Sequence, residues 1–212
     1  MAPTLLYVSV SPNGAGSSSR AVGEAYVEAW KAAHPGGAVV ERDLAANPVP
    51  VLDGEGLYAG YTPEDQRTPS AQAKHAARLA LIAELTGADD IVVATPMWNW
   101  NVPGVLKNWV DQLVMPGVLD GDGTNKLAGK RVTVVVAMGG GGYSVEGKAR
   151  FGWDGATGYL RNVFTALGST DVVTLNCQWG LAGVVPSMAE LLPVKAAELE
   201  AAKEAARKRA AA

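Results

Sequence analysis

Five strand-like runs alternate along the chain with longer stretches of helical periodicity, and this alternation constrains the fold more than any other feature. The runs cover residues 5–10, 38–43, 91–94, 131–137 and 171–177. Between them, apolar residues recur every three or four positions, as in amphipathic helices. Strands joined by helices are parallel, and the helices cover both faces of the sheet. The sequence therefore predicts a three-layer α/β fold with a doubly wound parallel sheet of five strands.

Several helix ends have recognisable signals. Three serines predict the start of a helix that ends near residues 35–37, and Thr68-Pro69 predicts the N-cap and first residue of a long helix that ends at Gly87. Thr62-Pro63 has the same pattern, while residues 54–61 are expected to form a loop or short turn. Residues 151–166 are expected to hold a further helix. Residues 187–190 read as a capping box that opens the last helix.

Composition narrows the class of protein. The 212 residues suit one α/β domain, 1–212, without a linker or internal repeat. A net charge of −3 gives no broad cationic field for nucleic acid. The single cysteine, Cys177, excludes an internal disulfide framework and suits a reducing compartment. No run reads as a signal peptide or membrane span. We therefore expect a cytoplasmic protein that binds neither nucleic acid nor membranes.

The stretch Thr95-Pro96-Met97-Trp98-Asn99-Trp100-Asn101-Val102-Pro103 is the strongest candidate for a functional loop. It follows a fully apolar strand and precedes a helix. Ligands of open α/β sheets bind at this carboxyl end of the strands. Two tryptophans in a solvated loop require a partner. We therefore expect this loop to flank a planar aromatic ligand, the alternative being that Trp98 and Trp100 fill the core or a subunit interface.

Two further loops are expected at the same edge. With strand order 2-1-3-4-5, the loops at residues 11–19, 95–103 and 137–144 leave neighbouring strands and meet in one pocket. The first offers serine hydroxyls and a helix N-terminus to a phosphate, although it matches neither the P-loop nor the dinucleotide pattern, and a plain serine N-cap is the alternative. The third has four consecutive glycines, which let the backbone approach a ligand closely. Its alternative is a flexible turn with Tyr143 on the surface.

The remaining histidine, cysteine, tryptophan and aspartate candidates are better explained by structural roles than by catalysis or metal binding. His34 and His75 lie on predicted helices away from the three loops and are expected on the surface. Cys177 is expected to be a buried small hydrophobe, and Trp109 a core residue. Asp120 and Asp122, in a long polar loop at residues 118–129, are better explained as solvated than as metal ligands. No side chain therefore stands out as a catalytic acid, base or nucleophile.

The three loops together resemble those of the FMN-dependent NADH:quinone oxidoreductases, or azoreductases, which have a flavodoxin-like fold. The stretch Met97-Trp98-Asn99-Trp100-Asn101-Val102-Pro103 is similar to the Met-Tyr-Asn-Phe-x-x-Pro loop of that family. Ser11-Pro12 with the serine triplet resembles its phosphate loop, and the residues around Asp43 resemble its stretch after the second strand. The resemblance extends to about Leu167.

This resemblance implies a tightly bound FMN, NADH or NADPH as hydride donor, and a quinone, azo compound or related aromatic acceptor in a ping-pong reaction. It also implies a homodimer whose active site lies at the subunit interface. The residues that it assigns to FMN binding are Ser11, Ser17, Ser18, Ser19, Pro96, Met97, Trp98, Asn99, Trp100, Ala137, Met138, Gly139, Gly140 and Tyr143.

Among the departures of the chain from the family pattern, two concern the expected pocket. Ala137-Met138 stands where the family commonly has Ser-Arg, which removes a hydroxyl and a cation. A cation beside the flavin would stabilise its reduced anion, so its loss predicts a lower redox potential or a different substrate. Trp98 and Trp100 replace smaller rings and predict a reshaped pocket.

Three rival functions remain open from the sequence. The first is a flavodoxin-type electron carrier that holds FMN but reacts with protein partners. The second is a fold relative that has lost FMN and serves as a binding or scaffold protein. The third is a tailoring reductase for one aromatic natural product, which would suit the changes at Trp98 and Met138.

Overall fold

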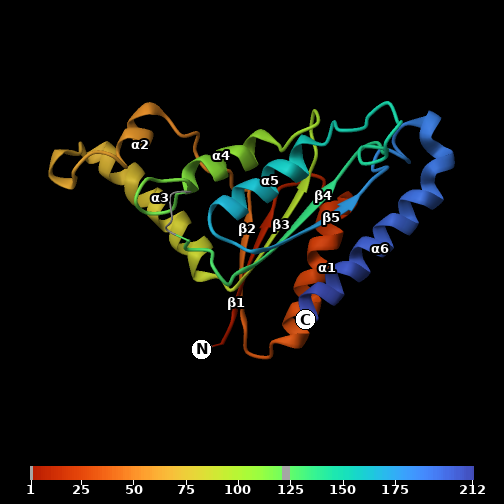
Figure 1. The fold of residues 1–212 in the computed structure, drawn as a ribbon, viewed down its shortest axis with the longest axis horizontal. Coiled ribbons are helices and arrows are strands. Elements are labelled where there is room, and N and C mark those ends of the chain that lie inside the picture. Colours follow the sequence, from red (N-terminus) through yellow and green to blue (C-terminus); the bar gives the residue numbers. More distant parts are fainter. Residues whose placement is uncertain (1, 121–124) are drawn as a thin grey trace.

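The computed structural model describes residues 2–120 and 125–212, so Asp122 lies outside the described residues. Its five strands form one all-parallel sheet in the order β2-β1-β3-β4-β5, which confirms the predicted fold class (Figure 1). The strands are β1 (Thr4–Ser9), β2 (Ala38–Asp43), β3 (Asp90–Pro96), β4 (Arg131–Ala137) and β5 (Asp171–Cys177).

Helices cover both faces of this sheet. Figure 1 shows α1 and α6 on one side and α3, α4 and α5 on the other. The helices are α1 (Ser18–Ala33), α2 (Gly54–Tyr58), α3 (Pro69–Gly87), α4 (Gly104–Leu113), α5 (Gly155–Ala166) and α6 (Leu192–Ala211). Short 3-10 turns, η1 (Gly14–Gly16), η2 (Glu64–Gln66) and η3 (Pro186–Leu191), complete the elements. Within residues 2–120 and 125–212, no helix combines the length and apolar character needed to cross a bilayer.

Strand periodicity explains how two cores form on one sheet. Leu5 and Tyr7 of β1 pack into the cluster that includes α1 and α6. Leu6 and Val8, which alternate with them, pack into the larger cluster under α3, α4 and α5. The strand β3 is buried except at its last residue because it runs between two strands and two helical layers. The sheet thus has a rigid centre from which the loops at its carboxyl edge project.

The structure sets the helix boundaries that the sequence left open and corrects others. Residues 54–58 form the helix α2 because the Asp53 carboxylate accepts a hydrogen bond from Gly56 N and caps its start. Thr62 does not cap a helix, since its hydroxyl donates to Tyr58 O and only a 3-10 turn follows. The last helix starts at Leu192 rather than at the predicted capping box because Pro193 lacks an N–H and is tolerated only in a first turn. The helix expected within residues 151–166 is confirmed as α5, which starts at Gly155 because Asp154 caps it.

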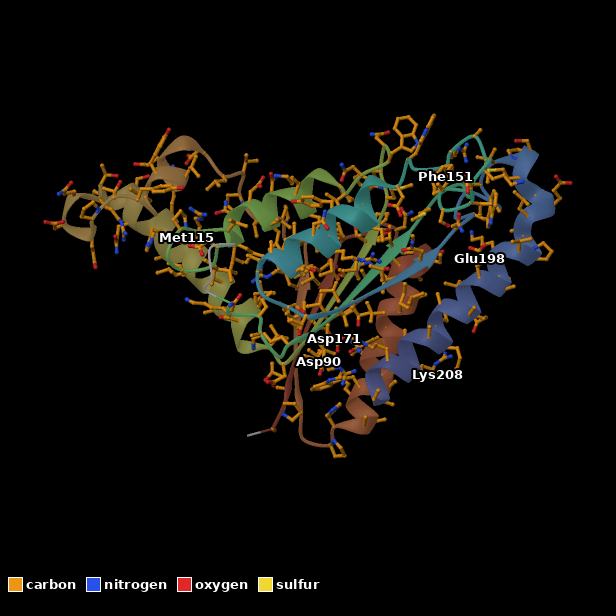
Figure 2. The ribbon with its side chains drawn as sticks, in the orientation of Figure 1. Asp90, Met115, Phe151, Asp171, Glu198 and Lys208 are labelled. Carbon is orange, nitrogen blue, oxygen red and sulfur yellow. The ribbon has the colours of Figure 1, made fainter. Side chains whose placement is uncertain are left out.

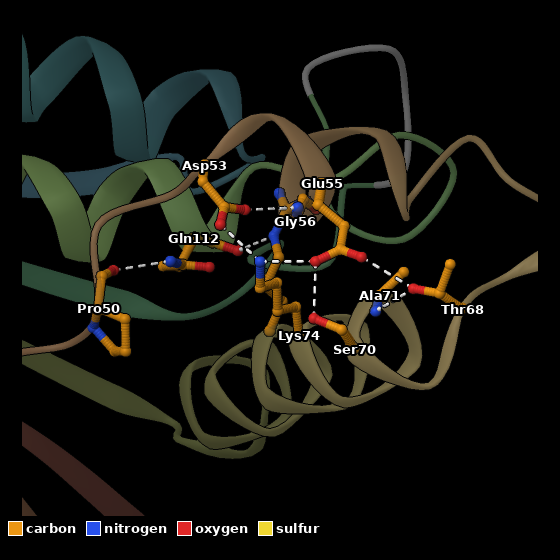
Figure 3. A network of polar contacts seen from close by, with 10 residues as sticks. Pro50, Asp53, Glu55, Gly56, Thr68, Ser70, Ala71, Lys74 and Gln112 are labelled. Carbon is orange, nitrogen blue, oxygen red and sulfur yellow. Dashed lines mark hydrogen bonds and ion pairs between the residues drawn. The ribbon is translucent and has the colours of Figure 1, made fainter.

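A polar network fixes the position of α4, the helix that follows the tryptophan-rich loop. The buried Arg78 of α3 donates to Gln112 O and Val114 O at the end of α4 and to Gly56 O of α2. Gln112 in turn donates to Pro50 O (Figure 3). In the same view, Lys74 pairs with Asp53 and Glu55. These contacts hold α2 and α3 against the carboxyl end of α4 and leave its amino end free to carry the loop.

Candidate functional site

The loops that follow β1, β3 and β4 lie side by side at the carboxyl edge of the sheet. Backbone bonds join the strand ends there: Val10 N donates to Ala94 O, Met97 N to Ala137 O and Met138 N to Cys177 O. In Figure 2, Phe151 lies toward this end of the sheet, whereas Asp90 and Asp171 mark the opposite end. The parallel order of the strands therefore brings together three segments that are far apart in sequence.

The serines of the first loop form a tight group at the start of α1. Ser11, Ser17 and Ser19 are buried, and Ser18 is half-buried. The Ser17 hydroxyl accepts a hydrogen bond from Arg20 N and lies 3.2 Å from that of Ser19. Ser17 is thus an N-cap, as the alternative interpretation held. The same placement also brings the hydroxyls of Ser17 and Ser19 together at the positive end of a 16-residue helix, which suits an anion.

Arg20 organises this loop, and sequence reasoning missed it. Its guanidinium donates to Ser11 O at 2.8 Å, to Ser9 Oγ at 3.0 Å and to Asp43 Oδ2 at 2.7 Å. Partial burial raises the pKa of Asp43, but the bonds from Arg20 and from the N–H groups of Ala46 and Ala45 outweigh burial and hold that pKa below its usual value. A shallow cavity of about 330 Å³ lies against Arg20 and Asp43. The signal was available, because Ser9 and Asp43 end neighbouring strands in register.

The tryptophan-rich loop is a two-residue hairpin turn. Trp98 and Asn101 exchange both backbone hydrogen bonds, and Asn99 and Trp100 between them have φ of +47° and +64°. Positive φ is common for Asn but costs a bulky residue on the order of 1 kcal/mol. Trp98 and Trp100 are 48% and 51% exposed, so the alternative that they fill the core is wrong. A strained turn that exposes two indoles is typical of a binding site.

Contacts with the segment before α5 hold this turn in place. The rings of Trp100 and Trp153 meet edge to face, with centroids 5.4 Å apart. Gly155 N donates to Trp100 O, and a Cβ on Gly155 would lie 2.8 Å from that oxygen. Sequence reasoning missed Trp153 because nothing local marks a partner more than fifty residues away. The turn is therefore braced from outside rather than free.

The glycine-rich loop is also braced, so the predicted alternative of a flexible turn with a surface tyrosine is wrong. Tyr143 is 7% exposed and belongs to the core, as does Met138, while Ala137 is half-buried. The segment after β5 pairs with the loop: Trp179 N donates to Gly140 O, and Gln178 Oε1 accepts from Gly142 N. These partners, at residues 178–181, were not predicted. The glycines are needed here because side chains of the protein itself approach them closely.

A cavity of about 260 Å³ joins the second and third loops. Its lining consists of Met97, Asn99, Trp100, Gly139, Gly140, Tyr143, Arg150, Leu181 and Met188. Six of the predicted site residues therefore share one cavity, and Arg150, Leu181 and Met188 were missed. The predicted residues that do not line it are Ser11, Ser17, Ser18, Ser19, Pro96, Trp98, Ala137 and Met138.

The remaining candidate groups play structural parts. Cys177 is 2% exposed, as predicted, and burial raises the pKa of its thiol to about 12. His75 was expected on the surface, but it is buried on α3 with Nδ1 3.1 Å from Arg67 Nη1. Burial, then Arg67 and Arg78, lower the pKa of His75. His34 is half-buried and stacks on Trp30. Among the residues that the structure describes, no cluster of histidine, cysteine and carboxylate side chains could hold a metal ion.

Known proteins are similar to this chain over almost its whole length. A family model described as "Flavodoxin-like fold" matches residues 3–209. An FMN-dependent NADH:quinone oxidoreductase of Frankia alni is 40% identical, over 99% of this chain and 100% of the relative. A protein of the same name from a Parafrankia species is 38% identical with the same coverage.

Solved structures show the same architecture. The crystal structure of azoreductase AzrA matches with a TM-score of 0.81 and 26% identity, over 97% of this chain and 99% of that one. An azoreductase from Bacillus anthracis matches with a TM-score of 0.81 and the same coverage. At 23% identity, that second likeness concerns the fold alone.

Proposed function

This chain belongs to the FMN-dependent NADH:quinone oxidoreductases of the flavodoxin-like fold, an enzyme family, and from that premise we propose its reaction. It binds FMN tightly and uses NADH or NADPH to reduce quinones, azo compounds or related aromatic acceptors. FMN, when bound, supplies the hydride chemistry. The observation that carries this proposal is the cavity between the tryptophan-rich and glycine-rich loops, which is open to a flat aromatic ring.

The residues present fit FMN at both of its ends. A dianionic phosphate suits the start of α1, where buried serines lie at the positive end of the helix dipole. A planar ring suits the cavity, because Met97 and Trp100 offer apolar surface and Asn99 offers polar groups. The two parts lie at neighbouring strand ends, as one long ligand requires.

Each predicted residue then has a part in binding. We assign the phosphate and ribityl end to Ser11, Ser17, Ser18 and Ser19. The ring is assigned to Pro96, Met97, Trp98, Asn99, Trp100, Ala137, Met138, Gly139, Gly140 and Tyr143. Met138 would act through its backbone, since its side chain is buried in the core.

The chain contributes binding, orientation and exclusion of water rather than acid or base chemistry. Trp100 and Tyr143 line the cavity and would shield a bound ring from water, and the strained Asn99–Trp100 turn would hold the Trp100 side chain in position beside that ring. Because one cavity serves both donor and acceptor, the two substrates occupy it in turn. We therefore propose a ping-pong mechanism.

An anaerobic absorption spectrum tests the proposal. The purified protein is expected to show a flavin band that NADH bleaches, and quinone addition is expected to restore it. Double-reciprocal plots at several quinone concentrations are expected to be parallel. A flavin band without quinone turnover would favour the electron carrier, and a colourless protein that takes up no FMN would contradict the proposed function.

We also propose that the enzyme is a homodimer with the active site at the subunit interface. Trp98, Trp100, Phe151 and Trp153 are about half exposed near the cavity, and exposed aromatic clusters mark interaction surfaces. Light scattering during gel filtration measures the mass, and a monomer at micromolar concentration would contradict this assignment. The single domain over residues 1–212 and the cytoplasmic location remain predictions.

A further inference from the structure

Arg150 is the one charged side chain among the described residues that line the cavity. It belongs to the segment between the glycine-rich loop and α5. The carbon of its guanidinium lies 5.9 Å from the centroid of the Tyr143 ring, within reach of a cation–π contact. All eight other lining residues are neutral, so the cavity carries a positive charge without a negative one.

Gly140 makes room for this guanidinium. A Cβ on Gly140 would lie 2.0 Å from Arg150 Nη1, closer than any contact between real atoms allows. The glycine-rich loop therefore serves to bring a cation against the backbone at the cavity wall. In residues 2–120 and 125–212, Arg150 forms no ion pair with a carboxylate. Arg150 is exposed, and its charge is available to a molecule in the cavity.

The position where the family commonly has arginine holds Met138, and the sequence alone predicted that the pocket had lost its cation. Met138 is 2% exposed and packs in the core, so it does not face the cavity. Arg150 lies twelve residues further along the chain and restores the missing charge by a different route. The departure at Met138 therefore does not leave the cavity neutral.

We propose that Arg150 tunes the redox equilibrium of the site by stabilising the negative charge that the ring of FMN gains on two-electron reduction. This inference rests on the proposed function, which supplies FMN and the nicotinamide donor. A positive charge beside the ring favours the more negative redox state. Arg150 thus raises the reduction potential of the bound flavin and lowers the driving force with which the flavin reduces an acceptor.

Three variants separate this role from general effects of charge. Arg150→Gln removes the charge, and Arg150→Lys keeps it. Lys148→Gln makes the same change of charge two residues away, at an exposed residue that does not line the cavity. For each variant, the reduction potential of bound FMN is measured by equilibration with a reference dye, and FMN affinity by fluorescence titration of the apoprotein.

Arg150→Gln is expected to shift the equilibrium about tenfold toward oxidised FMN, which is about 30 mV for a two-electron couple. Arg150→Lys is expected to retain most of the wild-type potential, and Lys148→Gln all of it. An unchanged potential in Arg150→Gln, or an equal shift in Lys148→Gln, would overturn the inference. If the wild type binds FMN and reduces quinones, that result leaves the proposed function intact, whereas a wild type without FMN binding overturns both.

Discussion

Among single residues, Arg20 and Asp43 show most clearly how the first loop depends on a long-range contact. Their ion pair joins the start of α1 to the end of β2 across the end of β1. No local pattern marks it, but the parallel register of β1 and β2 places Ser9 beside Asp43, and Arg20 is bonded to both. Prediction from sequence found the serines because they are a local cap signal, and missed the arginine because its partners come from other elements.

This pair predicts a pH dependence of stability. The pKa of Asp43 is below its usual value of 3.8 in the folded protein, so its ionised form stabilises the fold above that pH. Asp43→Asn is expected to lower the free energy of unfolding by on the order of 1 kcal/mol at pH 7. The deficit is expected to shrink as the pH falls below 3.8 and to vanish once the pH has fallen through the lower pKa of Asp43 in the folded protein.

Urea unfolding of both proteins between pH 7 and pH 3 measures this difference. Asp65→Asn is the matched control, because Asp65 is exposed and outside the network. A deficit that stays constant over the whole pH range would show that ionisation of Asp43 is not its source.

Ser17 and Ser18 form a second residue-scale test. Ser17→Ala removes the N-cap hydrogen bond to Arg20 N and is expected to cost about 1 kcal/mol of stability. Ser18→Ala makes the same chemical change at the first helical residue, which caps nothing, and is expected to leave stability unchanged. Chemical unfolding of the apoproteins gives both values. Equal losses would mean that the cap does not stabilise α1.

At the scale of elements, the bounds of the strands were easier to predict from the sequence than the contacts of the loops between them. Three strands match their predicted bounds because long apolar or alternating runs have few other solutions, as in β4 and β5. The packing of residues 178–181 on the glycine-rich loop was not predictable, because it depends on backbone bonds between segments about forty residues apart. The four glycines were read as room for a ligand, yet two of them, Gly140 and Gly141, first make room for Arg150 and Trp179.

Gly141 and Gly158 distinguish a glycine required by packing from one that is not. A Cβ on Gly141 would lie 2.2 Å from the Trp179 ring, so Gly141→Ala is expected to destabilise the fold by about 1–3 kcal/mol. Gly158 lies in α5 with open space around it, and Gly158→Ala is expected to stabilise by about 0.5–1 kcal/mol. Thermal unfolding checks both signs. A neutral Gly141→Ala would show that Trp179 moves aside freely.

At the scale of the whole molecule, the site depends on loops from different strands being held in one place. A ligand that binds only this arrangement stabilises the native state by mass action. FMN at 100 times its dissociation constant is expected to raise the free energy of unfolding by about 2.7 kcal/mol. Riboflavin at the same concentration lacks the phosphate and is expected to stabilise less, since the serine loop then has no anion to bind.

Urea unfolding with increasing FMN or riboflavin measures this stabilisation. Equal effects of the two ligands would show that the first loop does not hold the phosphate. The fold itself was predictable from alternating patterns, whereas the joint placement of the loops depends on side chains such as Arg20, Trp153 and Trp179, whose contacts appear only once the chain is folded.

The edge contact between Trp100 and Trp153 has a consequence for any redesign of the cavity. Because each indole supports the other, and Gly155 N also binds the Trp100 carbonyl, the hairpin and the segment before α5 form one mechanical unit. If only one of the two segments were replaced by the sequence of a relative, the other would lose the contacts that hold it. A redesign therefore has to replace the hairpin and the segment at residues 153–155 together.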